Sequence, residues 1–262
     1  MKKIIFLFCS LLYISTSFAQ NIEIDAEQKI EWHRNEQKII AIGNAIATKE
    51  KNILKGDKLT VIYERVQLED GTQKNQIQKV FSDGNVKIEM PDAYGTGEHF
   101  DYHLPLDKAI LIGKPALLKN QQGELTAEES ITYYGAENKS IALGNVIAKN
   151  PDYTIYADKM ISYFDTDKHG KKSLNRVEIY ASNKPVKIIN KQSTVTGKRG
   201  TYFPIENKLK IFDNVVINQN NDILNGDYAE TDLKTGISRL LATKSKNSRV
   251  TGVFRNKNNK KK

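Results

Sequence analysis

Apolar and polar residues alternate along most of the chain with the two-residue period of β-strands. After six Asn or Pro residues, apolar or small side chains occupy the first and third following positions, as at Val86 and Ile88 or at Val215 and Ile217. Successive side chains of a strand point to opposite faces, so each such pair shares one face. No segment combines a helical period with helix caps. The pattern predicts an all-β chain with more than a dozen strands.

The strand pattern is organised as a repeat of six two-strand units. In every unit a small residue, the second mark, lies 12 positions after the Asn or Pro, the first mark. The paired marks are Asn44 and Gly56, Asn85 and Gly97, Pro115 and Ala127, Asn145 and Ala157, Pro185 and Gly197, and Asn214 and Gly226. Gly-Asn dipeptides such as Gly43-Asn44 are turn signals, and proline is tolerated at the first residue of a strand. Six equal spacings predict one repeated fold unit.

Two units are longer than the others. Successive first marks are separated by 41, 30, 30, 40 and 29 residues, so units one to three resemble units four to six. The additional residues surround Leu68–Thr72 and Asp165–Gly170, which both resemble hairpins with a polar tip. Duplication of a three-unit block would produce this order. No Pro/Gly/Ser-rich linker interrupts residues 20–254, so we expect one continuous array.

The first 19 residues have the features of an export signal. Lys2 and Lys3 precede the apolar run Ile4–Ile14. The small residues Ser17 and Ala19 then occupy the two positions that a signal peptidase recognises. We expect cleavage after Ala19 and a periplasmic protein; the alternative is a retained membrane anchor. Cys9 is the only cysteine and lies inside the apolar run. The mature chain would then contain no disulfide and no thiolate metal site.

The charge of the chain favours anionic partners. Removing Lys2 and Lys3 with the leader lowers the formal charge from +9 to +7. Acidic lipid headgroups and phosphorylated sugars fit a basic surface, and export makes nucleic acid the least expected partner. Residues 255–262 are rich in Lys and Asn, which is typical of a disordered, solubilising tail.

The residues offer little support for catalysis or metal binding. His99, Asp101 and His103 share one face of a predicted strand, but this arrangement is more typical of a polar surface than of a metal site. An acidic residue follows the second mark in five units, at Asp57, Glu98, Glu128, Asp158 and Asp227. Calcium needs several oxygens around one ion, so we expect instead a solvated edge paired with lysines such as Lys58 and Lys159. We expect no enzyme, cofactor or metal.

The face shared by all six units is apolar. If two sheets close over this face, it forms an ordinary core; if they splay, it forms a long groove for acyl chains, and periodicity does not distinguish the two. The candidate lipid-binding residues on this face are Leu59, Val61, Val86, Ile88, Leu118, Val146, Val186, Ile188, Val215 and Ile217.

The segment Ile211–Asp232 resembles the OstA-like family, the periplasmic bridge proteins of lipopolysaccharide transport. It contains a turn, a short apolar strand, and then an apolar residue followed by Gly226-Asp227 and a second strand. The resemblance implies a twisted, V-shaped β-jellyroll that holds lipopolysaccharide acyl chains inside. It also implies end-to-end stacking through edge strands, either with other OstA-like domains at the inner and outer membranes or head-to-tail with further copies. The candidate edges are Ile22–Ile30 and Ser248–Phe254.

Three functions remain open at this point. The first is non-enzymatic transport of lipopolysaccharide across the periplasm toward the outer membrane, with a membrane-anchored subunit of the same system as a variant. The second is a structural or adhesive β-repeat protein with a closed core. The third, a polysaccharide-processing enzyme, lacks the paired carboxylates that such chemistry requires.

Overall fold

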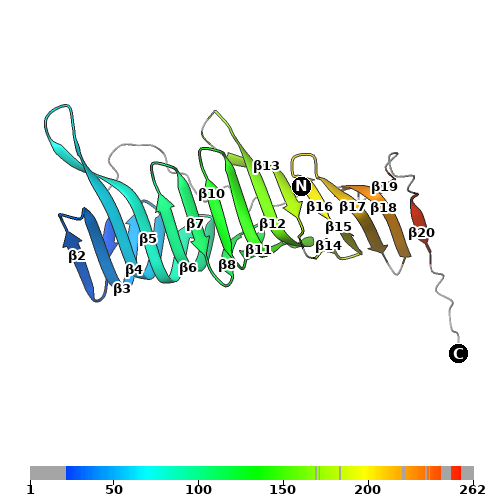
Figure 1. The fold of residues 1–262 in the computed structure, drawn as a ribbon, viewed down its shortest axis with the longest axis horizontal. Coiled ribbons are helices and arrows are strands. Elements are labelled where there is room, and N and C mark those ends of the chain that lie inside the picture. The colour runs from blue at the N-terminus through cyan, green and yellow to red at the C-terminus, as the bar shows by residue number, and fades with distance from the viewer. Residues whose placement is uncertain are drawn as a thin grey trace.

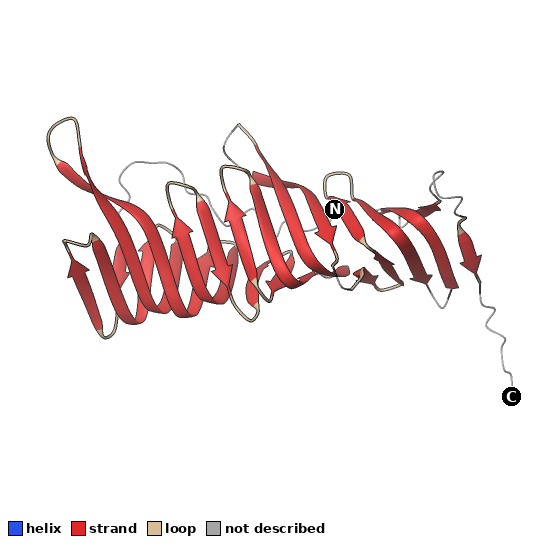
Figure 2. Cartoon of the chain, viewed as in Figure 1, coloured by secondary structure: helices blue, strands red, loops and turns tan. Residues whose placement is uncertain are grey.

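The described part of the chain consists of strands joined by turns and loops (Figure 2). The computed structural model describes residues 22–168, 170, 172–182, 184–219, 222–233, 235, 237–242 and 249–254. The expected export signal and the basic tail lie outside these residues. The twenty strands of the described residues form one antiparallel sheet, which confirms the all-β prediction. None of the described residues belongs to a helix suited to crossing a membrane.

The strands follow one another along the long axis, from β2 at one end to β20 at the other (Figure 1). In chain order they are β1 (Glu23–Asp25), β2 (Lys29–His33), β3 (Lys38–Lys49), β4 (Asn52–Gln67), β5 (Gln73–Met90), β6 (Ala93–His103), β7 (Lys108–Ile112), β8 (Ala116–Asn120), β9 (Gly123–Ala127), β10 (Ser130–Tyr134), β11 (Lys139–Lys149), β12 (Tyr153–Thr166), β13 (Lys172–Tyr180), β14 (Val186–Asn190), β15 (Ser193–Gly197), β16 (Arg199–Phe203), β17 (Lys208–Gln219), β18 (Asp222–Asp232), β19 (Ser238–Leu241) and β20 (Thr251–Val253).

The long strands each contribute to two half-sheets. Half-sheet 1 contains β2, β7, β10, β13, β16 and β19, together with one half of each long strand. Half-sheet 2 contains β1, β8, β9, β14, β15 and β20, together with the other half of each long strand. The two half-sheets meet along a corner and enclose an apolar interior, which is the arrangement of a jellyroll. We call strands β1–β9 the first block and strands β10–β20 the second block.

The marks of the sequence repeat lie at this corner. In all six units the residue after the first mark is the ladder partner of the second mark. The partners are Ala45 and Gly56, Val86 and Gly97, Ala116 and Ala127, Val146 and Ala157, Val186 and Gly197, and Val215 and Gly226. The 12-residue spacing is therefore the length of a hairpin that leaves the corner, turns at the far rim of half-sheet 2 and returns.

The first mark is asparagine where a strand runs unbroken through the corner. Gly43 and Asn44 have φ angles of 88° and 41°, and Gly84-Asn85 and Gly144-Asn145 repeat this left-handed pair. Glycine and asparagine adopt positive φ more readily than other residues. Each pair falls where the ladder register shifts, so it forms a β-bulge that bends the strand from one half-sheet into the other.

A carboxylate accepts from each of these asparagines, and at Asn85 and Asn145 it belongs to the acidic residue that follows a second mark. The Asn85 side-chain amide donates to both carboxylate oxygens of Asp57, at 3.1 and 3.0 Å. Asn145 likewise donates to Glu128 Oε2 at 2.6 Å. The sequence suggested Lys58 as the partner of Asp57, and this pairing is wrong. The bulge exposes the amide of its left-handed asparagine, and a carboxylate on the neighbouring strand accepts from it.

The two long units extend half-sheet 1 as predicted. Strands β4 and β5, of 16 and 18 residues, continue as a hairpin up to the turn at residues 68–72, which protrudes from the array in Figure 1. Strands β12 and β13 form the second extension, and Asp165 belongs to the end of β12 rather than to the hairpin tip. His169 lies outside the described residues.

Candidate functional site: the apolar interior

All ten residues that the sequence suggested for lipid binding face the interior. Their exposed fractions range from 0% to 8%. Leu59 and Val61 lie on half-sheet 1, and the other eight lie on half-sheet 2. They belong to one continuous cluster of buried apolar side chains that includes strands from both blocks. Their position is thus settled by the fold, whereas their contact with a lipid stays a prediction.

The first block leaves space between the two half-sheets. A cavity of about 140 Å³ lies there between the two half-sheets. Ala47, Leu54 and Ile88 line it from half-sheet 2, and Phe100 and Tyr102 line it from half-sheet 1. Nearly all of its walls are carbon, and the lining includes residues at the rim of half-sheet 2. Sequence reasoning identified Ile88 but missed the two aromatic residues, because their strand carries no repeat mark at those positions.

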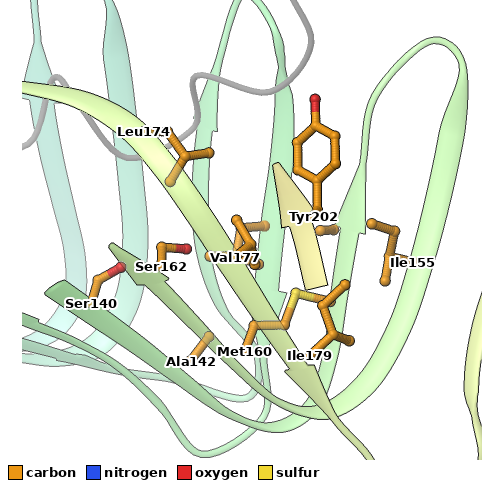
Figure 3. A pocket seen from close by; sticks show the side chains of 11 residues that line it. Ser140, Ala142, Ile155, Met160, Ser162, Leu174, Val177, Ile179 and Tyr202 are labelled. Atoms are coloured by element: carbon orange, nitrogen blue, oxygen red, sulfur yellow. The ribbon is translucent and has the colours of Figure 1, made fainter. Parts of the chain in front are cut away.

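The interior of the second block is more tightly filled. A gap of about 30 Å³ remains there, whereas a buried water needs roughly 10–15 Å³. Figure 3 shows Met160 and Ile179 at its apolar side and Ser140, Ser162 and Tyr202 among its other walls. Over much of their length the half-sheets therefore pack against each other as a core. These two cavities differ in size.

Two interior tyrosines remain neutral over the physiological pH range. Burial, followed by the nearby Asp107 carboxylate, raises the pKa of Tyr102 far above its usual value. The Tyr102 hydroxyl donates to Asp107 Oδ1 at 3.1 Å. Burial is also the main cause that raises the pKa of Tyr202. Both phenols can therefore act as hydrogen-bond donors within apolar surroundings, and neither supplies a charge.

His99, Asp101 and His103 lie on strand β6. His99 Nδ1 lies 2.6 Å from Asp83 Oδ1, and both side chains are partly exposed. His103 Nδ1 and Asp101 Oδ1 are buried without a hydrogen-bond partner among the described residues. Across those residues no three His, Cys, Asp or Glu side chains are grouped closely enough to hold a metal ion.

Strand edges are present at both ends of the array. Among the described residues, strands β1 and β2 pair only with β3, and β19 and β20 pair only with β18. The predicted edges at Ile22–Ile30 and near the end of the chain are confirmed as edges, although Ser248 lies outside the described residues. The edge strand β19 was not predicted. Apolar side chains are exposed at both ends, with Trp32 53% and Val253 52% exposed.

A jellyroll of repeated two-strand units around an apolar interior defines the class of this protein. The family described as LptA/(LptD N-terminal domain) LPS transport protein matches the chain twice, over residues 23–139 and 126–237. The chain belongs to this family of lipopolysaccharide transport proteins. The two matches overlap at the junction of the two blocks, in agreement with the duplication that the mark spacings indicated.

Among solved structures, 16 chains match this protein. One is LptH from Pseudomonas aeruginosa, titled the LptA homologous periplasmic component of the conserved lipopolysaccharide transport device. It is 15% identical, with a TM-score of 0.44, and the alignment covers 52% of this chain and 96% of LptH. No curated protein matches the sequence significantly.

Proposed function

We propose that this protein carries lipopolysaccharide through the periplasm by enclosing its acyl chains between the two half-sheets. The observation that carries the proposal is the cavity of about 140 Å³ in the first block, which has almost entirely apolar walls. It opens onto an apolar interior shared by both blocks. Because the chain belongs to a family of lipopolysaccharide transport proteins, we take lipopolysaccharide as the lipid.

Burial of acyl chains is sufficient to hold such a lipid without chemistry. Each methylene group removed from water contributes about 0.8 kcal/mol. The sugars of lipopolysaccharide are polar and would remain outside the half-sheets. The protein would act by binding alone, and the energy for directional transport toward the outer membrane would come from a partner. The export signal that the sequence predicts, with cleavage after Ala19, supports a periplasmic location for this activity.

Photo-crosslinking with a small diazirine amino acid tests this proposal in cells. Ile88 lines the cavity, and Lys87 is its exposed neighbour on the opposite face of β5. We expect a lipopolysaccharide adduct at Ile88 and none at Lys87. The pair Ile217 and Val216 repeats the comparison in the second block, where Ile217 is 4% exposed.

The same experiment can contradict the proposal. If folded protein gives no adduct at Ile88 or Ile217, the interior is a closed core. The protein would then be a structural β-repeat protein that binds only at its outer surface.

The proposal includes partners at the two ends of the array. An unpaired strand edge is a template for another strand, and exposed apolar side chains on the edge strands favour association. Other domains of the same family, or further copies of this chain, would continue the two half-sheets. We expect Ile30→Cys on β2 and Leu241→Cys on β19, together in one chain, to give linked multimers with a short bis-maleimide.

The matched control for end-to-end stacking replaces the Ile30 cysteine by one at Tyr94, an exposed residue in the middle of the array. Multimers of equal yield from the Tyr94 and Leu241 pair would contradict end-to-end stacking.

A further inference from the structure

The second block contains polar groups in an otherwise apolar interior. Ser140 and Ser162 are ladder partners on half-sheet 1, and they line the small cavity together with Tyr202. Ser140 and Tyr202 are each 2% exposed. Ser140 and Ser162 come from the neighbouring strands β11 and β12, and Tyr202 comes from β16 beyond β13; Figure 3 shows the two serines on one side and Tyr202 on the other. The equivalent row of the first block has a single hydroxyl, that of Tyr102, which donates to Asp107.

The hydroxyl group of Tyr202 is a polar group that makes no hydrogen bond in the described structure. Its oxygen is buried and has no hydrogen-bond partner among the described residues. Burial keeps its proton in place by raising its pKa, so the group is available as a donor. A buried hydroxyl without a partner is unfavourable, and native structures seldom retain one without a role. The geometry therefore points to a polar atom that enters the cavity from outside the chain.

A cation lies at the rim above this cavity. Lys172 and Leu174 occupy alternate positions of β13, and Leu174 lines the cavity. The Lys172 ammonium contacts the hydroxyl of Tyr133 and lies 4.9 Å from the centre of its ring. Tyr133 is the ladder partner of Ser140, so this contact places the ammonium next to the hydroxyl row. Lys172 takes part in no ion pair with the described residues, whereas several neighbouring rim lysines do.

The order of these groups from the corner to the rim is apolar, then hydroxyl, then cationic. Met160 and Ile179 lie deepest, Ser140 and Tyr202 follow, and Lys172 lies at the rim. An acylated anionic lipid has the same order: a hydrocarbon chain, an ester or amide carbonyl, and a phosphate group. The gap of about 30 Å³ admits one small polar group, and the flexible Met160 side chain can move to admit a chain.

We propose that the second block contains a subsite that recognises the acyl linkage of lipopolysaccharide, with Tyr202 donating to a linkage carbonyl and Lys172 facing a phosphate. This inference rests on the proposed function and assigns it a specific group of residues. The first-block cavity would hold chains without regard to their linkage, whereas this subsite would fix the depth at which a chain sits.

The test uses the purified full chain with purified lipopolysaccharide. A diazirine amino acid at Leu174 reports on the subsite, and one at Phe100 reports on the first-block cavity. We expect Tyr202→Phe to lower the adduct at Leu174 about five-fold, the effect of one hydrogen bond, and to leave the adduct at Phe100 unchanged. Lys172→Gln should act in the same direction.

Two matched controls accompany these variants. Tyr180→Phe removes a tyrosine hydroxyl on the outer face of the same block, where it donates to Glu178 Oε2 at 2.9 Å. Lys187→Gln removes an exposed lysine charge. Neither should change the adduct at Leu174. Thermal melts establish that each variant is folded.

The outcomes separate the subsite from the proposed function. An unchanged Leu174 adduct in Tyr202→Phe, or an equal loss at Leu174 and Phe100, overturns the subsite. An adduct at Phe100 alone in the unsubstituted chain also overturns it and leaves the proposed function standing. No adduct at either position overturns the proposed function. Vesicles of phosphatidylglycerol provide the second arm: adducts at Leu174 from these vesicles but not from lipopolysaccharide would overturn the assignment to lipopolysaccharide.

Discussion

Replacing Ile217 with aspartate is expected to destabilise the second block strongly. Ile217 is 4% exposed and pairs with Leu224 and Val195 in the ladder of half-sheet 2. A carboxylate at this position would be buried without a partner, which costs roughly 3–5 kcal/mol. That is a large share of the roughly 5–15 kcal/mol by which a folded domain is stable. Denaturant unfolding, followed by circular dichroism, measures the loss as a lower midpoint.

Val216→Asp is the control for this substitution. Val216 lies on the same strand with its side chain on the opposite, partly exposed face, so we expect it to cost about 1 kcal/mol or less. If Ile217→Asp kept the midpoint of the unsubstituted protein, water would reach this part of the interior. The half-sheets would then splay there into an open groove.

Replacing Gly97 with valine is expected to destabilise the corner by about 3 kcal/mol or more, the upper range for an overpacked site. A Cβ atom at Gly97 would lie 2.5 Å from the Ile112 carbonyl oxygen and 2.8 Å from Leu111 Cδ1. The first of these neighbours is backbone, so strand β7 would have to move. The denaturation midpoint should fall, and the slope of the transition should stay the same if the array still unfolds as one unit.

The second mark of unit four provides the matched control for Gly97→Val. Ala157 already accommodates a methyl group at the equivalent corner position, so Ala157→Gly should cost only about 1 kcal/mol. A Gly97→Val protein as stable as its parent would mean that the corner is loosely packed. The small second marks would then need an explanation other than close approach.

The sequence predicted the fold because its periodicity is set by local geometry. A hairpin of fixed length returns to the same corner, so the spacing from Asn85 to Gly97 encodes the ladder pair Val86 and Gly97 directly. Alternation of side chains along a strand then places Ile88 inside. These constraints act between residues close in the chain, and six copies make them visible.

Contacts between different units were not predictable in the same way. The hydrogen bond from Asn85 to Asp57 joins residues 28 positions apart, and sequence alone suggested lysine partners for such acids. Likewise, Lys172 contacts Tyr133 across 39 positions. Lys172 and Tyr133 do not belong to the repeat pattern. They meet only because β10 to β13 lie side by side in half-sheet 1. The sizes of the interior gaps depend on side-chain packing, which periodicity does not describe.

Because the ladder of strands continues across the two blocks, the protein has a fixed length. Each unit adds two strands to each half-sheet, or about 10 Å at the usual strand spacing. β9 pairs with β11, and β7 with β10, so the two blocks are joined by ladder pairs in both half-sheets. Two single-block chains would reach as far only while they stay associated, which depends on their concentration. In this protein the length of the array does not depend on concentration, because one polypeptide chain connects the two blocks.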